Sequence, residues 1–166
     1  MTDLGVFSGA VLATPDEKGR LALPAVLRNS VPGDGKSRQL FVTTHEVAPC
    51  LVASGVDRKQ RIADRIDRAE DLAAQRNAEF DRFALERRLF GPGETFPIDG
   101  SGRFILSEML CEIGEFAGEL FFYGAGQYFE IWDLQRLLSM DGTAYETAKR
   151  AAQAAVRIRD RKAAKP

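Results

Sequence analysis

The residues of this chain that are best suited to chemistry belong to a short charged motif that occurs twice. Both copies read Asp-x-x-Gly-Arg, and 83 positions separate them: Asp16, Gly19 and Arg20 form the first copy, and Asp99, Gly102 and Arg103 form the second. Glycine tolerates a positive φ, so each copy predicts a tight turn. An arginine on such a turn can donate to a phosphate or to the edge of a guanine. With Lys18 and Arg28 near the first copy, the motif predicts a surface that presents positive charge in an array.

The aspartate of each copy allows a second interpretation. Asp16 can pair with Arg20, and Asp99 with Arg103, so that each ion pair does no more than close its own turn. An exposed ion pair contributes little to stability by itself. Charge and spacing leave the two interpretations open. They are also compatible, because an aspartate can hold an arginine in the orientation that DNA requires.

Residues suited to catalysis are few. The single histidine, His45, has no serine or cysteine beside it in a recognisable catalytic frame. The pair Gly124-x-Gly126 lacks the third glycine and the following helix of a dinucleotide-binding motif, so it predicts a turn. Cys50 and Cys111 are far apart and have no metal-ligand or disulfide spacing. We therefore predict a protein that is not an enzyme, with no catalytic residue, metal, cofactor or small-molecule substrate.

Each charged motif lies inside a longer repeat with a fixed order of expected elements. An entering strand leads to the turn, a short strand and a short helix follow it, and a pair of strands closes the unit. The expected strands cover 5–14, 20–23, 40–44 and 49–53 in the first copy, and 94–98, 103–106, 120–123 and 128–132 in the second. The offset falls from 83 to 80 residues along the repeat, which predicts a longer turn at 32–36 in the first copy. Four short strands are too few to stand alone, so each copy requires the other copy or another subunit.

Two further segments predict helices outside the repeated elements. Residues 56–90 contain no glycine or proline and carry two apolar stripes at helical spacing: Ile62, Ile66, Ala69 and Ala73, and then Leu72, Arg76, Phe80 and Phe83. We expect one or two solvated helices there, with a break near Asn77. Asp133 is expected to cap a helix, and the tail from Glu146 predicts another. The chain is thus divided into a first repeat at 6–54, a helical connector at 55–90, a second repeat at 91–138, and a C-terminal helix with a basic tail at 139–166.

Composition limits how the chain can bind nucleic acid. Its 166 residues are 45% apolar and 28% charged, which is ordinary for a globular protein, and the net charge is −1. A nucleic-acid role must therefore come from local clustering of cations. Residues 6–13 are apolar but short and lack a basic leader, and no stretch reaches the length of a membrane span. We expect a soluble cytoplasmic protein without a membrane partner.

Three motifs, in order, resemble the signatures of the MraZ family of bacterial transcription regulators. They are Asp16-x-Lys18-Gly19-Arg20-Leu21-x-Leu23-Pro24-x-x-Leu27-Arg28, Asp99-x-x-Gly102-Arg103-x-Ile105-Leu106, and Gly124-x-Gly126-x-x-Phe129-Glu130-Ile131-Trp132-Asp133. The resemblance runs from about residue 6 to residue 138. It implies an α+β, mainly β fold, in which tandem SpoVT/AbrB-like repeats form a pseudo-two-fold β-barrel with flanking α-helices.

The same resemblance implies a function and its residues. Members of the family are expected to form homo-oligomeric rings, octamers or dodecamers, that bind double-stranded DNA at repeated promoter boxes upstream of division and cell-wall genes, usually as nucleoid-associated repressors. The implied DNA contacts are Lys18, Arg20 and Arg103, with Arg28 as a weaker candidate. The residues implied to support the turns are Asp16, Gly19, Asp99 and Gly102.

The second copy departs from the first at three positions. Ser101, Ser107 and Cys111 stand where the first copy has Lys18, Pro24 and Arg28. We therefore expect the first turn to dominate affinity for DNA. The alternative function is an oligomeric ring scaffold that acts through a protein partner, with the Asp–Arg turns purely structural.

Overall fold

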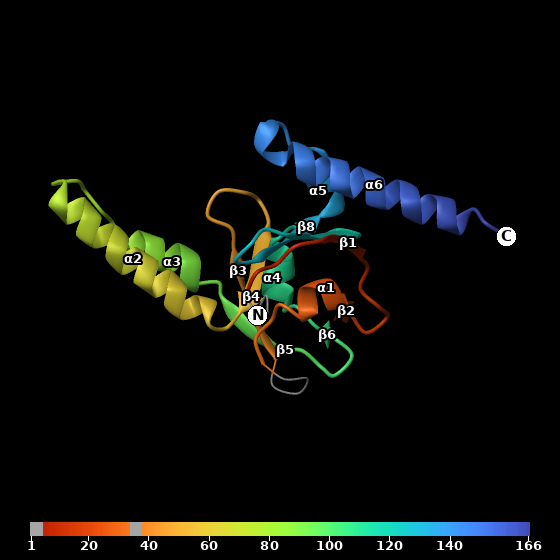
Figure 1. The fold of residues 1–166 in the computed structure, drawn as a ribbon, viewed down its shortest axis with the longest axis horizontal. Coiled ribbons are helices and arrows are strands. Elements are labelled where there is room, and N and C mark those ends of the chain that lie inside the picture. Colours follow the sequence, from red (N-terminus) through yellow and green to blue (C-terminus); the bar gives the residue numbers. More distant parts are fainter. Residues whose placement is uncertain (1–4, 34–37) are drawn as a thin grey trace.

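The chain folds around a twisted antiparallel sheet, from which two helical segments project in different directions. The computed structural model describes residues 5–33 and 38–166. Helices α2 and α3 extend to one side of the sheet, and the long helix α6 runs along the other side towards the C-terminus (Figure 1). Most of the longer turn predicted at 32–36 lies outside the described residues.

The elements follow the repeated order that the sequence predicts. The first repeat contains β1 (Ala10–Ala13), β2 (Leu21–Ala22), α1 (Ala25–Arg28), β3 (Gln39–Thr44) and β4 (Leu51–Gly55). The second contains β5 (Glu94–Pro97), β6 (Arg103–Phe104), α4 (Glu108–Ile113), β7 (Leu120–Gly124) and β8 (Phe129–Asp133). Between them lie α2 (Arg58–Gln75) and α3 (Arg82–Phe90), and after them α5 (Leu134–Leu138), a short 3-10 helix (Thr143–Tyr145) and α6 (Glu146–Ala163).

The order of strands shows that the two repeats form one intertwined unit. Six strands pair in the order β1-β7-β8-β4-β3-β5, and β2 pairs with β6 in a separate two-stranded ribbon. All of these pairs are antiparallel. Replacing each strand by its counterpart in the other repeat turns the six-stranded order into its own reverse. The entering strand of each repeat is also exchanged, since β1 pairs with β7 and β5 pairs with β3.

The pairing register places a pseudo-two-fold axis between the repeats. Leu51 of β4 lies opposite Ile131 of β8, which is 80 positions away. Leu21 of β2 lies opposite Phe104 of β6, which is 83 positions away. These separations equal the offsets of the sequence repeat, so Leu51 and Leu21 each lie opposite their own counterpart in the other repeat. The axis therefore passes through both central pairs of strands.

The predicted α+β class is confirmed, with one correction to its balance. Helices α2 and α6 contain 18 residues each, whereas no strand in residues 5–33 and 38–166 exceeds 6, so this part of the chain is not mainly β. The long helices lie outside the repeats, where the repeat pattern carries no information about length. In the described part of the chain, strands β1 and β5 stand at the two ends of the sheet order, and closure into a barrel stays a prediction.

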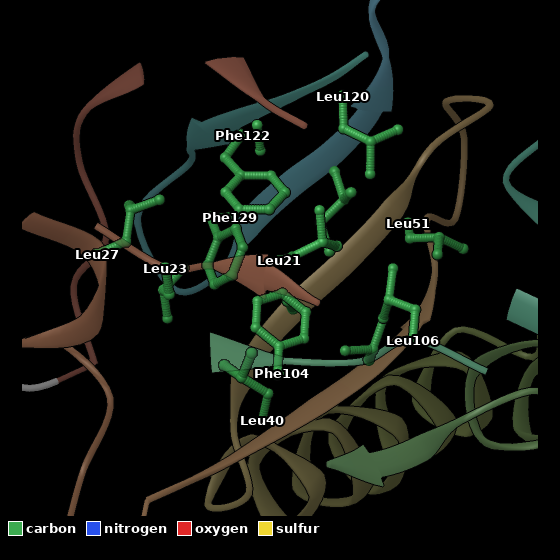
Figure 2. Packing of buried hydrophobic residues seen from close by; sticks show 14 of the residues in the cluster. Leu21, Leu23, Leu27, Leu40, Leu51, Phe104, Leu106, Leu120, Phe122 and Phe129 are labelled. Atoms are coloured by element: carbon green, nitrogen blue, oxygen red, sulfur yellow. The ribbon is translucent and has the colours of Figure 1, made fainter. Parts of the chain in front are cut away.

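A single apolar core fills the space between the six-stranded sheet and the β2–β6 ribbon. Both repeats supply its side chains, among them Leu21, Leu23, Leu27, Leu40, Leu51, Phe104, Leu106, Leu120, Phe122 and Phe129 (Figure 2). On the other face of the sheet, Trp132 and Phe121 pack with Ala148 and Ala152 of α6. Alanine on α6 allows the helix to approach the aromatic rings closely. This second cluster fixes the C-terminal helix to the sheet.

Two local expectations are wrong. Strand β1 begins only at Ala10, because Gly9 has a φ of 107° that interrupts the extended backbone. Leu72 and Phe83, predicted to continue an apolar stripe, are 45% and 68% exposed because α2 and α3 are buried through other residues, Ile62, Ile66 and Leu89. The predicted break near Asn77 is confirmed, since Asn77 has a φ of 50° between the two helices.

Truncating the side chain on the pseudo-two-fold axis is expected to destabilise both repeats together. Leu51 is fully buried, so Leu51→Ala should lower the free energy of unfolding by about 2–5 kcal/mol through lost burial and a residual cavity. Urea denaturation followed by circular dichroism measures this change. Val47→Ala is the matched control, because Val47 is 85% exposed and its loss should change stability by no more than about 0.5 kcal/mol. Equal effects of the two substitutions would contradict the burial of Leu51 in the core that both repeats share.

Candidate nucleic-acid interface

The first charged turn is closed by its aspartate. Asp16 Oδ1 accepts hydrogen bonds from the backbone N–H groups of Lys18 at 2.9 Å and Arg20 at 2.8 Å. Asp16 Oδ2 accepts from Arg20 Nε at 2.7 Å. The backbone N–H of Asp16 donates to the carbonyl of Arg20, and Gly19 donates to the carbonyl of Asp16, both at 2.9 Å. Gly19 has a φ of 78°, a conformation that residues with a side chain rarely adopt.

The second turn has the same five hydrogen bonds. Asp99 Oδ1 accepts from the backbone N–H groups of Ser101 and Arg103, and Asp99 Oδ2 accepts from Arg103 Nε, all at 2.9 Å. The backbone of Asp99 donates to Arg103 at 3.0 Å, and Gly102, with a φ of 81°, donates to Asp99 at 2.9 Å. Every bond therefore has its equivalent 83 positions earlier. The ion pairs that would close each turn are present, and the two arginines are held in the same way.

Each turn holds its arginine by one edge of the guanidinium. Nε faces the aspartate, and within the described residues no hydrogen bond engages the two terminal nitrogens of Arg20 or Arg103. Both side chains are partly exposed. The terminal nitrogens are the donors that form paired hydrogen bonds with phosphates and guanines. The aspartate thus fixes the direction in which these donors point.

The ribbon of β2 and β6 places both arginines on one side. Leu21 and Phe104 face each other and are buried in the core. Side chains alternate along a strand, so Arg20 and Arg103, next to these buried residues, face the opposite side. Ala22, directly opposite Arg103 in the ribbon, is exposed, in keeping with a solvent-facing surface. The ribbon therefore presents the two Asp–Arg turns towards solvent, related by the pseudo-two-fold axis.

The electrostatics of the turns favour ionised carboxylates. Hydrogen bonds from the backbone N–H of Arg20 hold the pKa of Asp16 below its ordinary value, and those from Arg103 act in the same way on the pKa of Asp99. The side-chain bonds from the same arginines add to this effect. The aspartates therefore remain charged near neutral pH and keep their arginines oriented.

Arg28, the weaker candidate for a DNA contact, lies beside the second turn. It ends helix α1, and its Nη1 donates to the carbonyl oxygen of Ser101 at 3.0 Å. Its counterpart Cys111 is a free thiol whose pKa is raised by partial burial. The sequence shows the difference between these two residues. It does not show that Arg28 reaches the turn of the other repeat, because that contact spans 73 positions and depends on the fold.

His45, for which the sequence shows no catalytic partner, ties the β3–β4 loop to β8. Its Nδ1 accepts backbone hydrogen bonds from Val47 at 3.0 Å and Ala48 at 2.9 Å, so the proton of the neutral ring belongs on Nε2. Nε2 lies 3.2 Å from the hydroxyl of Tyr128 and 3.3 Å from Glu130 Oε2. Both ring nitrogens therefore have partners that anchor the loop.

Residues 5–33 and 38–166 were compared with the requirements of two other kinds of site, a metal centre and a membrane span. Residues 5–33 and 38–166 contain no group of three or more histidine, cysteine, aspartate or glutamate side chains placed to hold a metal ion. No helix in these ranges has the length and apolar character needed to cross a membrane.

Fold and site together define a duplicated α+β protein that presents two matching Asp–Arg turns on an exposed β-ribbon. The chain is 30% identical over 130 residues to "Transcriptional regulator MraZ" of Methylobacillus flagellatus, which covers 78% of this chain and 82% of that protein. It is 32% identical over 129 residues to the protein of the same name from Saccharophagus degradans, with 76% and 82% covered, and 28% identical over 129 residues to that of Treponema denticola, with 78% and 83% covered. No family model matches the chain. The chain belongs to the MraZ family.

The two turn carboxyls are expected to titrate below the ordinary range of aspartate. A native pKa below the unfolded value means that the ionised carboxylate stabilises the turn at higher pH, and that this stabilisation is lost as the pH falls through the native pKa. Carbon-detected NMR titration of the side-chain carboxyls should give values below 3.8 for both Asp16 and Asp99. A value at or above 3.8 for either residue would contradict the hydrogen bonding described.

The two turn glycines are expected to differ in how far they tolerate alanine. A Cβ at Gly102 would lie 2.9 Å from the carbonyl oxygen of Leu23, whereas a Cβ at Gly19 would meet nothing within 4 Å. Positive φ alone makes each alanine unfavourable by about 1 kcal/mol. Gly19→Ala should therefore lower the free energy of unfolding by about that amount, and Gly102→Ala by clearly more. Urea denaturation of both variants compares them, and equal losses would show that the packing around the second turn adds nothing.

Proposed function

We propose that this chain is a sequence-specific DNA-binding transcriptional regulator. It acts as a repressor of division and cell-wall genes by binding repeated boxes in their promoters, in the cytoplasm and on the nucleoid. The observation that carries the proposal is the pair of matching Asp–Arg turns on one exposed face of the β2–β6 ribbon. The names of the MraZ relatives support the same class of function.

The proposed contacts follow from the geometry of the ribbon. A two-stranded β-ribbon can enter the major groove of B-DNA, where arginine donates to O6 and N7 of guanine. Arg20 and Arg103 would supply these contacts through their terminal nitrogens, while Lys18 would bind a backbone phosphate as a point charge. Asp16 and Asp99 hold the arginines in place. Arg28, the weaker candidate, lies beside the second turn through its bond to Ser101.

A ring of subunits would reconcile DNA binding with a net charge of −1. Each subunit would touch few phosphates, but several subunits bound to spaced boxes would act multivalently. The proposed homo-oligomer is an octamer or a dodecamer. Apolar side chains exposed on the two helical segments support further contacts between subunits: Leu72 and Phe83 on the α2–α3 arm, and Ile158 on α6.

The reversible strand order also supports the finer proposal on the fold. Tandem SpoVT/AbrB-like repeats at 6–54 and 91–138 would close a pseudo-two-fold β-barrel, with the connector at 55–90 and the C-terminal segment at 139–166 as flanking helices. The exchange of β1 and β5 supports this arrangement, because neither repeat completes its sheet without the other.

Removing the arginine of the first turn is expected to weaken specific binding. Arg20→Ala should weaken binding to the chain's own upstream DNA by at least about tenfold, because one bidentate base contact contributes about 1–3 kcal/mol per subunit. Fluorescence anisotropy across a salt series measures the affinity. If each subunit neutralises about two phosphates and about three subunits engage, log K should fall with log salt at a slope of roughly −5.

Arg68→Ala is the matched control, since Arg68 is an exposed arginine on α2, far along the chain from both turns. It removes the same charge and should leave affinity for DNA unchanged. Light scattering of each variant checks that oligomer size is kept. A slope near −1, or an Arg20→Ala variant that binds like the wild type, would refute the proposed contacts. Absence of any DNA binding by a folded oligomer would favour the alternative, a ring scaffold for a protein partner with purely structural turns.

A further inference from the structure

The second turn is fastened to the first repeat by two contacts. Arg28 Nη1 donates to the carbonyl of Ser101 at 3.0 Å, and the backbone N–H of Leu23 donates to the carbonyl of Gly102 at 2.8 Å. The Arg28 side chain also lies directly against the α-carbon of Gly102, where an added Cβ would come within 3.0 Å of its Cδ. The turn that carries Arg103 is therefore held from outside as well as by its own aspartate.

The first turn provides a comparison within the same chain. The counterpart of Arg28 is Cys111, which has no side-chain nitrogen to donate. Among the described residues, Leu106, the counterpart of Leu23, makes no hydrogen bond to the carbonyl of Gly19, and nothing lies within 4 Å of a Cβ built on Gly19. Instead, a cavity of about 230 Å³ opens between this turn and α4, lined by Gly19, Cys111, Phe116 and neighbouring apolar residues. Within residues 5–33 and 38–166, the first turn is therefore held by its own hydrogen bonds alone.

We propose that Arg28 is a positioning residue, which fixes the turn of the second repeat so that Arg103 is already oriented when it meets DNA. This inference rests on the proposed DNA-binding function of the turns. Arg28 acts through Arg103, since its Nη1 donates to the carbonyl of Ser101 in the second turn. The second turn is restrained by its own aspartate and by the first repeat, whereas the first turn, with its additional cation Lys18, is restrained by its own aspartate.

The reason for this arrangement is the small number of contacts that the second turn makes. It carries Ser101 where the first turn carries Lys18, so Arg103 is its only cation. A single arginine cannot gain from neighbouring contacts if it is misplaced. Fixing the turn before binding reduces the conformational entropy lost on association. Arg28 thus compensates for the lower charge of the second copy.

A double-mutant cycle on the full chain separates positioning from direct contact. Affinity for the upstream DNA is measured for Arg28→Ala, Arg103→Ala and the double variant, and likewise for Arg28→Ala combined with Arg20→Ala. We expect Arg28→Ala to weaken binding about tenfold, to have no further effect when Arg103 is already removed, and to multiply with Arg20→Ala. An Arg28→Ala effect that multiplies with Arg103→Ala would identify a direct DNA contact and overturn the proposal, as would a wild-type affinity of Arg28→Ala.

Hydrogen exchange tests the same proposal without DNA. In Arg28→Ala the backbone amides of Ser101 and Arg103 should exchange about tenfold faster, while those of Lys18 and Arg20 keep their rates. Cys111→Ala is the matched control at the equivalent position, and it should leave all four amides unchanged. Unchanged exchange at Ser101 and Arg103 in Arg28→Ala would overturn the proposal. If the wild-type protein fails to bind DNA while Arg28→Ala shows the expected faster exchange, the proposed function is refuted but the role of Arg28 in fixing the turn is kept.

Discussion

The exchange of entering strands between the repeats is the constraint on which the rest of the structure depends. Strand β1 lies in the sheet beside β7 of the second repeat, yet the chain must return within residues 14–20 to form β2. Strand β5 must likewise reach β6 within residues 98–102. A tight reversal with a fixed exit direction is required at both places. The aspartate clamps the two ends of the turn, and the glycine supplies the positive φ. The Asp–Arg turns thus serve the topology of the fold, whatever their arginines bind.

The frame enforces equality where side chains are buried and permits divergence where they are not. Leu27 and Leu110 are counterparts, and both are fully buried beneath the short helices α1 and α4. Three residues earlier, at the start of each helix, the counterparts differ: Ser107 caps α4 by accepting from the N–H of Leu110 at 3.2 Å, whereas Pro24 starts α1 without a side-chain cap. Close packing allows little change of volume in the core. The helix starts and their outward residues tolerate more, which is where the repeats acquired different properties.

The sequence predicts the local features of this fold well because they depend on nearby residues. The two Asp–Arg pairs, the turn at Gly124 and Gly126, and the cap at Asp133, which accepts from the N–H of Arg136 at 3.1 Å, all involve residues within a few positions of each other. The exchange of β1 and β5 is different, because hydrophobic periodicity indicates which residues are buried and not which strand they meet. The contact between Arg28 and Ser101 depends on that exchange, so the sequence does not predict this contact either.

The charge of the turns explains why their geometry matters more than their field. Residues 16–20 contain two acidic and two basic side chains, and residues 99–103 contain one of each, so each turn is formally neutral. A neutral turn does little to attract DNA from beyond the Debye length of about 8–10 Å. Its arginines become effective only when their terminal nitrogens touch phosphates or bases directly, since such short-range bonds depend steeply on distance and angle. A protein that reads DNA with neutral turns must therefore fix the orientation of each arginine. The aspartates do so within each turn, and Arg28 extends the same restraint across the pseudo-two-fold axis.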